Sequence, residues 1–178
     1  ARAVPPSGII DVVAYGFERP GLIPLWAGEG DLPTPGFIAE AATRSLAAGE
    51  TFYTYQRGLP DLREALADYH ASLYGKPFDP DAFYVTGSGM QAIQITLQAL
   101  VGAGEEVIVP TPAWPNLAAA AMVLEGRPVE VPMDFDGERW SLDPAAIEAA
   151  VTPSTRAIFV NTPANPSGWT ADAAALAA

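Results

Sequence analysis

The turn at residues 86–91, Thr-Gly-Ser-Gly-Met-Gln, has the residue types that bind an anion. Ser88 supplies a hydroxyl group, and Gly89 lets an oxygen atom approach the backbone closely. With Met90, these residues begin a predicted helix, whose first amide groups have no intrahelical acceptor and lie at the positive end of the helix dipole. Three interpretations fit the turn: it binds a nucleotide, it binds a single phosphate group, or it is a capped turn that binds nothing.

The nucleotide interpretation rests on the pattern G-x-G-x-x-A at residues 87–92, which is close to a dinucleotide fingerprint. That fingerprint also needs an acidic residue at the end of the next strand, to bind a ribose. The next predicted strand runs into Val-Pro-Thr at 109–111, and its acidic residues precede it. A P-loop is excluded because Lys76, the only lysine, is followed by proline. A single phosphate group therefore fits the turn better.

Two further loops follow predicted strands and carry groups suited to a flat ligand. Trp114 stands between two prolines in "TPAWP", and its indole is either part of the core or a stacking surface. Asn161 and Asn165 lie in "NTPANPSG", where asparagine suits a turn but also offers an amide donor. A phosphate-binding turn, a flat aromatic ring and an amide donor together suit a phosphorylated planar cofactor, and pyridoxal phosphate fits this description.

These loops need a sheet to bring them together. Apolar runs predict strands at 82–86, 106–110, 128–132 and 156–161. Apolar periodicity and capping residues predict helices from Phe37 to a stop at Gly49, from Pro60 to a cap at Gly75, through 93–101, over 115–126 and from Asp143 to Val151. The alternation indicates an α/β fold: a mostly parallel sheet with crossover helices, preceded by an extended N-terminal arm over 1–36 that is rich in proline and glycine. In such sheets, ligands bind beyond the carboxyl ends of the strands.

Composition excludes several classes of partner and site. The chain has 21 acidic and 9 basic residues, a net charge of −12, which disfavours nucleic acid and anionic membranes. There is no cysteine, and one histidine, His70, makes no metal site, so no metal is expected. No apolar run is long enough to span a membrane, and the first residues lack the features of a signal peptide, so a cytoplasmic location is expected.

Four segments resemble, in this order and spacing, the N-terminal portion of the class I/II aminotransferases, pyridoxal-phosphate-dependent enzymes of fold type I. The segments are "LWAGEGDLPTP", "FYTYQRGLPDLREALADY", "VTGSGMQAIQITLQALVGAGEEVIVPTPAWPNL" and "NTPANPSG". The resemblance extends from about Leu22 to Gly168. It implies an enzyme that transfers an amino group between an amino acid and a 2-keto acid, and a homodimer. It also implies that 1–48 form the N-terminal arm and first helix, and that 49–178 form the first part of the large cofactor-binding domain.

The resemblance assigns cofactor-binding roles to particular residues. Ser88, Gly89 and Met90 are expected to bind the cofactor phosphate. Trp114 is expected to stack on the pyridine ring, and Asn165 is expected to hydrogen-bond the phenolic oxygen of that ring.

Two residues in the first third of the chain have roles implied by the same resemblance. Tyr53 matches the tyrosine that reaches the cofactor phosphate of the neighbouring subunit, and Gly28 lies where the arm approaches the substrate carboxylate. The Schiff-base lysine of the family follows the region that the chain matches, so no catalytic residue is expected within this chain and the chain alone is expected to be inactive. Both ends look cut.

Two alternatives to the aminotransferase remain open at this point. One is a dinucleotide-binding oxidoreductase domain, supported by the glycine pattern at 87–92. The other is a non-catalytic fragment that only dimerises.

Overall fold

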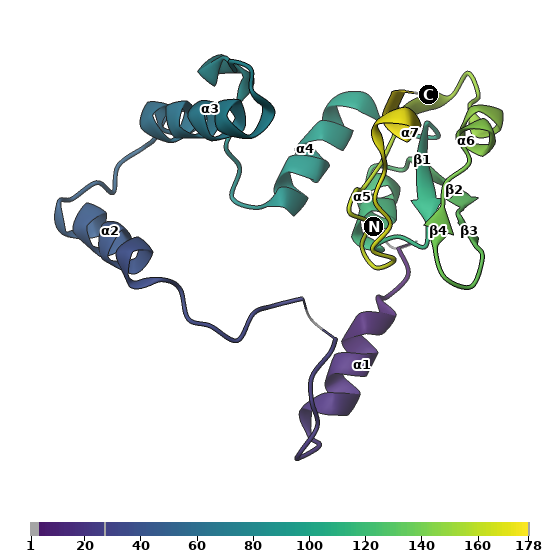
Figure 1. Ribbon diagram of the computed structural model, residues 1–178, viewed down its shortest axis with the longest axis horizontal. Coiled ribbons are helices and arrows are strands. Elements are labelled where there is room, and N and C mark those ends of the chain that lie inside the picture. The colour runs from purple at the N-terminus through teal and green to yellow at the C-terminus, as the bar shows by residue number, and fades with distance from the viewer. Residues whose placement is uncertain (1–3, 27, 178) are drawn as a thin grey trace. The chain divides into compact units, whose positions relative to one another are not determined.

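A computed structural model describes residues 4–26 and 28–177 (Figure 1). The described chain divides into two compact units, one made of 88–177 with 4–8, and the other of 9–26 with 28–87. The domain boundary expected from the family lies elsewhere, at 48 and 49. That boundary concerns the complete fold and stays a prediction.

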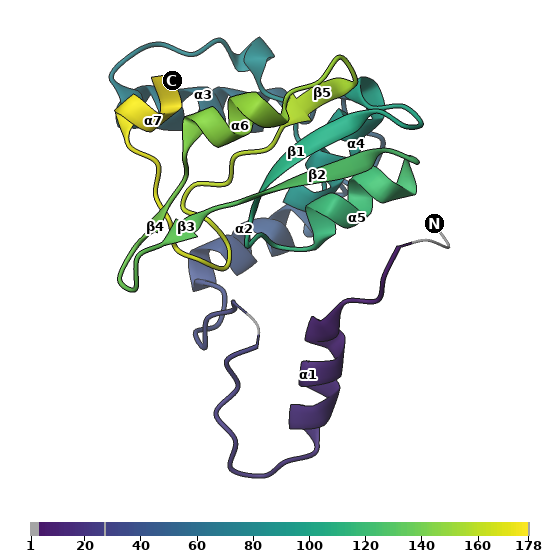
Figure 2. The same cartoon turned by 90° about the vertical axis from the view of Figure 1, so that its right-hand side faces the viewer.

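The first unit is built on a parallel sheet of the strands β1 (Glu106–Thr111), β2 (Arg127–Pro132) and β5 (Thr155–Ile158). The strand order is β2-β1-β5, so β1 is central, and Figure 2 shows the three strands side by side. Four of the six residues of β1 are buried, as expected of a central strand covered on both faces. The predicted α/β class and the parallel sheet are thereby confirmed.

Helices α4 (Gly89–Leu100), α5 (Asn116–Val123) and α6 (Pro144–Ala150) cover this sheet. The connection through α5 leads from β1 to β2, whereas the connection through α6 leads back across β1 to β5. The two helices lie on opposite faces of the sheet, as Figure 1 shows, which is the arrangement that right-handed crossovers produce for this strand order. Helix α4 packs against α5 and therefore belongs to the same face.

The core of this unit fills the space between β1, α4 and α5. Its buried members are Leu97, Val101, Val107, Val109, Leu117, Ala120 and Ala121. Val107 and Val109 alternate with Ile108 along β1, so Ile108 is buried on the opposite face. Full burial of a side chain such as Leu117 contributes roughly 1.5–3 kcal/mol to the stability of the fold.

A buried carboxylate ties the amino ends of the three strands together. Glu106 is 2% exposed and pairs with Arg127 at the start of β2. Its carboxylate also accepts hydrogen bonds from the hydroxyls of Thr152 at 2.7 Å and Thr155 at 3.3 Å. These partners compensate the cost of burying a charge in the sheet.

The rest of the first unit consists of short elements. Strands β3 (Asp134–Phe135) and β4 (Trp140–Ser141) form an antiparallel hairpin, and α7 (Ala173–Ala177) follows the last loop. The sequence predicted no strand here, because two-residue strands are too short to show an alternation of apolar and polar residues.

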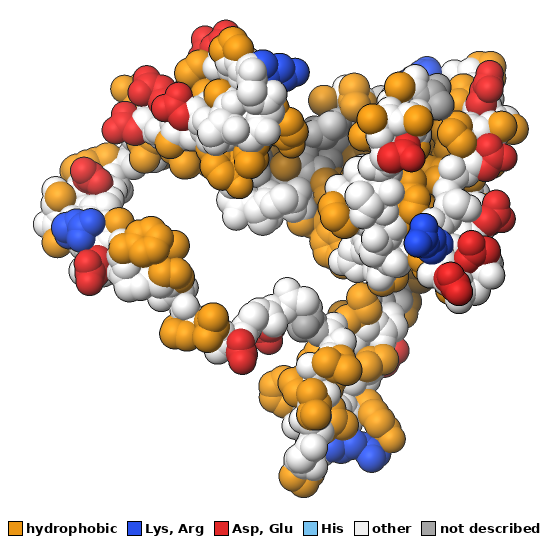
Figure 3. All heavy atoms as spheres, in the orientation of Figure 1, with side chains coloured by type: hydrophobic (Ala, Val, Ile, Leu, Met, Phe, Trp, Pro, Cys, Tyr) orange, Lys and Arg blue, Asp and Glu red, His pale blue; other side chains and the backbone are white. Residues whose placement is uncertain are grey.

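The second unit contains α1 (Gly8–Phe17), which begins at the boundary, α2 (Gly36–Ala47), α3 (Pro60–Tyr74) and the 3₁₀ helix η1 (Pro80–Ala82). The helices predicted from Phe37 and Pro60 are confirmed, and Gly75 ends α3 in the left-handed conformation expected of a cap. Many apolar side chains of this unit are open to solvent, and Figure 3 shows them over α1 and α3.

Two predictions for this unit are wrong. The arm over 1–36 is not extended throughout, because α1 occupies Gly8–Phe17, with Trp26 packed against Gly16. The segment 82–86 is not a strand either. The Val85 amide donates to the Arg57 carbonyl, and the Phe83 carbonyl accepts from the side chain of Arg63.

Candidate functional site

The N-terminus of α4 has the geometry of an anion-binding turn. The Ser88 hydroxyl accepts a hydrogen bond from the Gln91 amide at 3.1 Å, as an N-cap does. The Cα of Gly89 faces open space, with no heavy atom within 4 Å of the position of an added Cβ. An oxygen atom can thus approach the amides of Gly89 and Met90 at the positive end of the helix.

Helix length places this turn at the carboxyl end of the sheet. Residues 101–105 join α4 to β1, so the helix and the strand run in opposite directions. The 12 residues of α4 rise about 18 Å, and the six residues of β1 rise about 20 Å. Met90, in the first turn of α4, and Ala113, after β1, both pack against the core described above. The Ser88 turn and the loop after β1 therefore lie at the same end of the unit.

Asn165 lies in a turn held by its own backbone. The Asn165 amide donates to Oδ1 of Asn161 at 3.0 Å, and the Ala164 amide donates to the carbonyl of Trp169 at 2.8 Å. Asn165 is exposed and lines a cavity with Pro112, Trp169 and other residues beyond the ends of the strands. That cavity is about 10 Å³, enough for one water molecule, so the flat ring of a cofactor does not fit inside it.

Trp114 lines a separate cavity of about 280 Å³. Its neighbours there include Val109 and Thr111 of β1, Met122 of α5 and the N-terminal segment 5–7. Trp114 and Asn165, which the resemblance assigns to one cofactor, thus line different cavities in the structure. Trp114 lies two residues before α5 and lines its cavity together with residues of that helix. The loop after β5 instead lies beside Pro110 and Pro112.

Tyr53 and Gly28 belong to the second unit. The Tyr53 side chain is fully exposed, and an added Cβ at Gly28 would meet no atom within 4 Å. The roles expected of these two residues, and of Ser88, Gly89, Met90, Trp114 and Asn165, all stay predictions. Lys76 lies in the second unit too, with its Nζ 5.4 Å from the centre of the Phe78 ring.

Residues that sequence reasoning missed complete the loop after β5. Trp169 lines the Asn165 cavity and accepts the Ala164 hydrogen bond through its carbonyl. The Thr162 hydroxyl accepts a hydrogen bond from the Ala171 amide at 2.8 Å. Thr162 lies nine residues from Ala171, and Trp169 lies five residues from Ala164. Such spacings give no periodic signal, so only the folded loop reveals these residues.

The shifted pKa of Glu105 belongs to the opposite end of the sheet from this site. The Gly102 amide, helped by Arg156, holds the pKa of Glu105 below its ordinary value of 4.5, and Glu105 precedes β1 at the opposite end of that strand. Among the described residues, no group of three acidic or histidine side chains is arranged to hold a metal ion. None of the described helices is long and apolar enough to cross a membrane.

The family model described as "Aminotransferase class I and II" matches residues 20–178. A probable aspartate/prephenate aminotransferase of Thermus aquaticus is 39% identical over 171 residues, which are 94% of this chain and 44% of that protein. An aspartate aminotransferase of Pyrococcus horikoshii is 36% identical over 160 residues, 88% of this chain and 41% of that protein. The chain thus spans less than half the length of these curated relatives.

Solved structures agree with the sequence comparisons. N-succinyldiaminopimelate aminotransferase from Mycobacterium tuberculosis aligns with a TM-score of 0.90 at 30% identity, covering 99% of this chain and 46% of that one. Aspartate aminotransferase from Thermus thermophilus with maleate aligns with a TM-score of 0.88 at 38% identity, covering 98% and 47%. The match with the family model extends over most of the chain and includes all four motifs, and the structural alignments cover nearly the whole chain. The chain belongs to the class I and II aminotransferase family.

Proposed function

We propose that this chain is the N-terminal part of a pyridoxal-phosphate-dependent aminotransferase that moves an amino group between an amino acid and a 2-keto acid. The observation that carries the proposal is the family match over residues 20–178, which includes the Ser88, Trp114 and Asn165 motifs. The relatives are named for aspartate and prephenate. We extend only the general class of amino acid and keto acid to this protein.

The chain's own residues fit the phosphate of that cofactor. The Ser88 hydroxyl and the amides of Gly89 and Met90 are donors at the positive end of a 12-residue helix, with open space at Gly89. The Ser88 oxygen also accepts from the Gln91 amide, which fixes the side chain at the start of the helix. These groups would hold the phosphate and thereby orient the ring.

Groups from the other loops would contact the ring. The Asn165 backbone is fixed by Asn161 while its exposed side chain is available to donate to a ring oxygen. Trp114 would stack on the ring, for which its indole has to leave the cavity that segment 5–7 lines. Bound pyridoxal phosphate supplies an electron sink for reactions at the α-carbon of an amino acid.

The proposed enzyme is a homodimer, and residues of the second unit would contact the cofactor and the substrate. Tyr53 would reach the cofactor phosphate of a neighbouring subunit, which requires a homodimer, and Gly28 would lie near the substrate carboxylate. The exposed aromatic side chains at 52–55 support such a contact between copies. We also expect the protein to act in the cytoplasm.

Titration of the chain with pyridoxal phosphate, followed by tryptophan fluorescence, tests the proposal. Ser88→Ala should raise the dissociation constant roughly tenfold, because one hydrogen bond to a charged group contributes about 1.5–3 kcal/mol. Asp143→Ala is the matched control, since Asp143 caps α6 through the Ala145 amide and lies outside the proposed site.

The same titration separates the alternatives. NAD measured in parallel tests the dinucleotide-binding domain, and tighter binding of NAD than of pyridoxal phosphate would favour it. A chain that dimerises and binds neither compound would be the non-catalytic fragment. Equal affinities of Ser88→Ala and the unchanged chain for pyridoxal phosphate would contradict the assigned phosphate site.

A further inference from the structure

The loop at 51–59 carries three aromatic side chains that are almost free of the chain's own packing. Phe52, Tyr53 and Tyr55 are 86%, 108% and 68% exposed. The loop has no helix or strand between α2 and α3, and its own backbone bonds are short-range, such as Gly58 amide to Tyr55 carbonyl at 2.9 Å. A tyrosine on such a loop can meet a ligand reproducibly only if the base of the loop is held from elsewhere.

The base of the loop is held against the segment that follows η1. The Val85 amide donates to the Arg57 carbonyl at 2.9 Å. Gly58 has φ +100°, and a Cβ there would lie 2.5 Å from Cγ2 of Val85. Residues 57 and 58 are therefore in close contact with Val85, at a position where only glycine fits.

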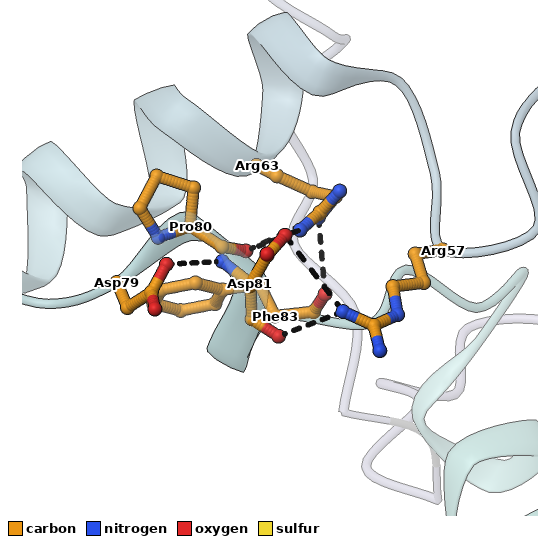
Figure 4. A network of polar contacts seen from close by, with 6 residues as sticks. All are labelled: Arg57, Arg63, Asp79, Pro80, Asp81 and Phe83. Atoms are coloured by element: carbon orange, nitrogen blue, oxygen red, sulfur yellow. Dashed lines mark hydrogen bonds and ion pairs between the residues drawn. The ribbon is translucent and has the colours of Figure 1, made fainter.

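The side chain of Arg63 holds the segment 80–83 against α3. Its side chain, 12% exposed, extends from the first turn of α3 and donates from Nε to the carbonyls of Pro80 at 3.1 Å and Phe83 at 3.2 Å. Its Nη2 donates to the Pro80 carbonyl at 2.9 Å and pairs with the Asp81 carboxylate. Figure 4 shows this guanidinium between the carbonyl groups of Pro80 and Phe83. The fixed fork of an arginine can satisfy several acceptors at once, and lysine cannot.

Asp81 links the same network to the loop. One of its carboxylate oxygens pairs with Arg63 and lies 3.7 Å from Nη1 of Arg57, and Nη1 is also 3.4 Å from the Asp81 carbonyl (Figure 4). A single carboxylate thus faces one arginine from the loop and one from α3. Asp79 fixes the turn beneath it by accepting from the Asp81 amide at 2.8 Å.

We infer that Arg63 and Asp81 are positioning residues for Tyr53. They hold the 80–85 segment against α3, and that segment holds the end of the aromatic loop through Val85. The cofactor part of this inference rests on the proposed function.

Amide hydrogen exchange tests the network without any cofactor. Arg63→Lys keeps the charge and removes the fork, and Asp81→Asn removes the shared carboxylate. Each should speed exchange at the Val85 and Gly58 amides at least tenfold, while the Gly75 amide, bonded to the Ala71 carbonyl at the end of α3, stays protected. Arg44→Lys is the matched control, because Arg44 makes only an exposed pair with Glu40 in α2. Unchanged exchange at Val85 and Gly58 would overturn the inference.

A double-mutant cycle with pyridoxal phosphate tests the positioning role. Arg63→Lys and Tyr53→Phe should each raise the dissociation constant severalfold, and the double variant should bind no more weakly than Tyr53→Phe alone. Fully additive effects, or an unchanged dissociation constant in Arg63→Lys, would mean that the network only stabilises the fold. If the unchanged chain binds no pyridoxal phosphate, the proposed function fails, and the exchange experiment still decides whether the network holds the loop.

Discussion

Single polar side chains carry much of the organisation of this protein. The Ser88 hydroxyl starts α4, the Asn161 amide oxygen shapes the turn of Asn165, and the Glu106 carboxylate joins three strands. Each accepts a hydrogen bond from a backbone amide or from a second side chain. The two at the carboxyl end of the sheet belong to the candidate site, whereas Glu106 at the amino end is structural.

Glu106 gives the clearest prediction at this scale. Glu106→Ala should lower the free energy of unfolding by about 1–3 kcal/mol, because it removes a buried carboxylate that pairs with Arg127 and accepts from the partly buried Thr152 and Thr155 hydroxyls. Urea denaturation followed by circular dichroism measures the change. Glu130→Ala is the control: Glu130 is exposed on β2 of the same sheet and should shift the midpoint little. Equal losses in the two variants would contradict the role given to Glu106.

At the scale of elements, the sheet and its crossovers follow general rules, and the short pieces depend on local chemistry. The order β2-β1-β5 and the opposite faces of α5 and α6 follow from right-handed connections. The β3–β4 hairpin instead depends on Asp136, whose carboxylate accepts from the Glu138 and Arg139 amides at 2.8 Å each.

The hairpin should respond to pH through Asp136. The Arg139 and Glu138 amides hold the pKa of Asp136 below its ordinary value of 3.8. A carboxyl group whose pKa is lower in the folded state stabilises that state above its unfolded pKa and loses this effect as the pH falls through the folded pKa. Trp140, whose ring centre is 4.9 Å from that of Phe135 across the hairpin, should therefore change its fluorescence below about pH 4.

Asp136→Asn keeps an acceptor oxygen and removes the titration. In this variant the Trp140 signal should no longer follow pH in that window. Both the Asp136→Asn variant and its reference protein should carry phenylalanine in place of the other tryptophans, Trp26, Trp114 and Trp169. The tryptophan fluorescence then reports on Trp140 in the hairpin. A pH response that survives in Asp136→Asn would assign it to another group.

At the scale of the whole molecule, the chain covers 44% of its Thermus aquaticus relative and contains one lysine. Lys76 follows α3, with its Nζ 5.4 Å from the Phe78 ring, in a different unit from Ser88. A Schiff base with pyridoxal phosphate needs a lysine amine at the aldehyde of the bound cofactor. We therefore expect binding without a specific covalent adduct and without transamination by this chain.

Borohydride reduction in the presence of pyridoxal phosphate, followed by peptide mapping, measures this. Labelling of the Lys76 peptide should be slow and should not saturate, as for any exposed amine. Lys76→Arg should bind pyridoxal phosphate as tightly as the unchanged chain. Saturable, one-to-one labelling of Lys76 together with turnover of an amino acid would contradict the prediction.

The sequence alone determined the family, the α/β class and the positions of the main helices and strands. These features are encoded by local signals. The signals are the regular spacing of apolar residues, capping residues such as Asp143 and Gly75, and motifs in a fixed order. The sequence predicted a strand at 82–86 because that run is apolar. Whether an extended run becomes a strand depends on a neighbouring backbone, and in the structure the arginines at 57 and 63 hold this run instead.

Only the tertiary structure decided which side chains meet. Trp114 and Asn165 both lie in loops that follow strands, yet they line different cavities. The path of the loop that carries each residue decides which cavity its side chain lines. The Arg63–Asp81 network joins residues 18 positions apart, and Glu106 meets Thr152 across 46 positions. No local pattern encodes such distances. They arise when crossover connections and turns bring remote segments into contact, and that packing, rather than residue type, selects the partners.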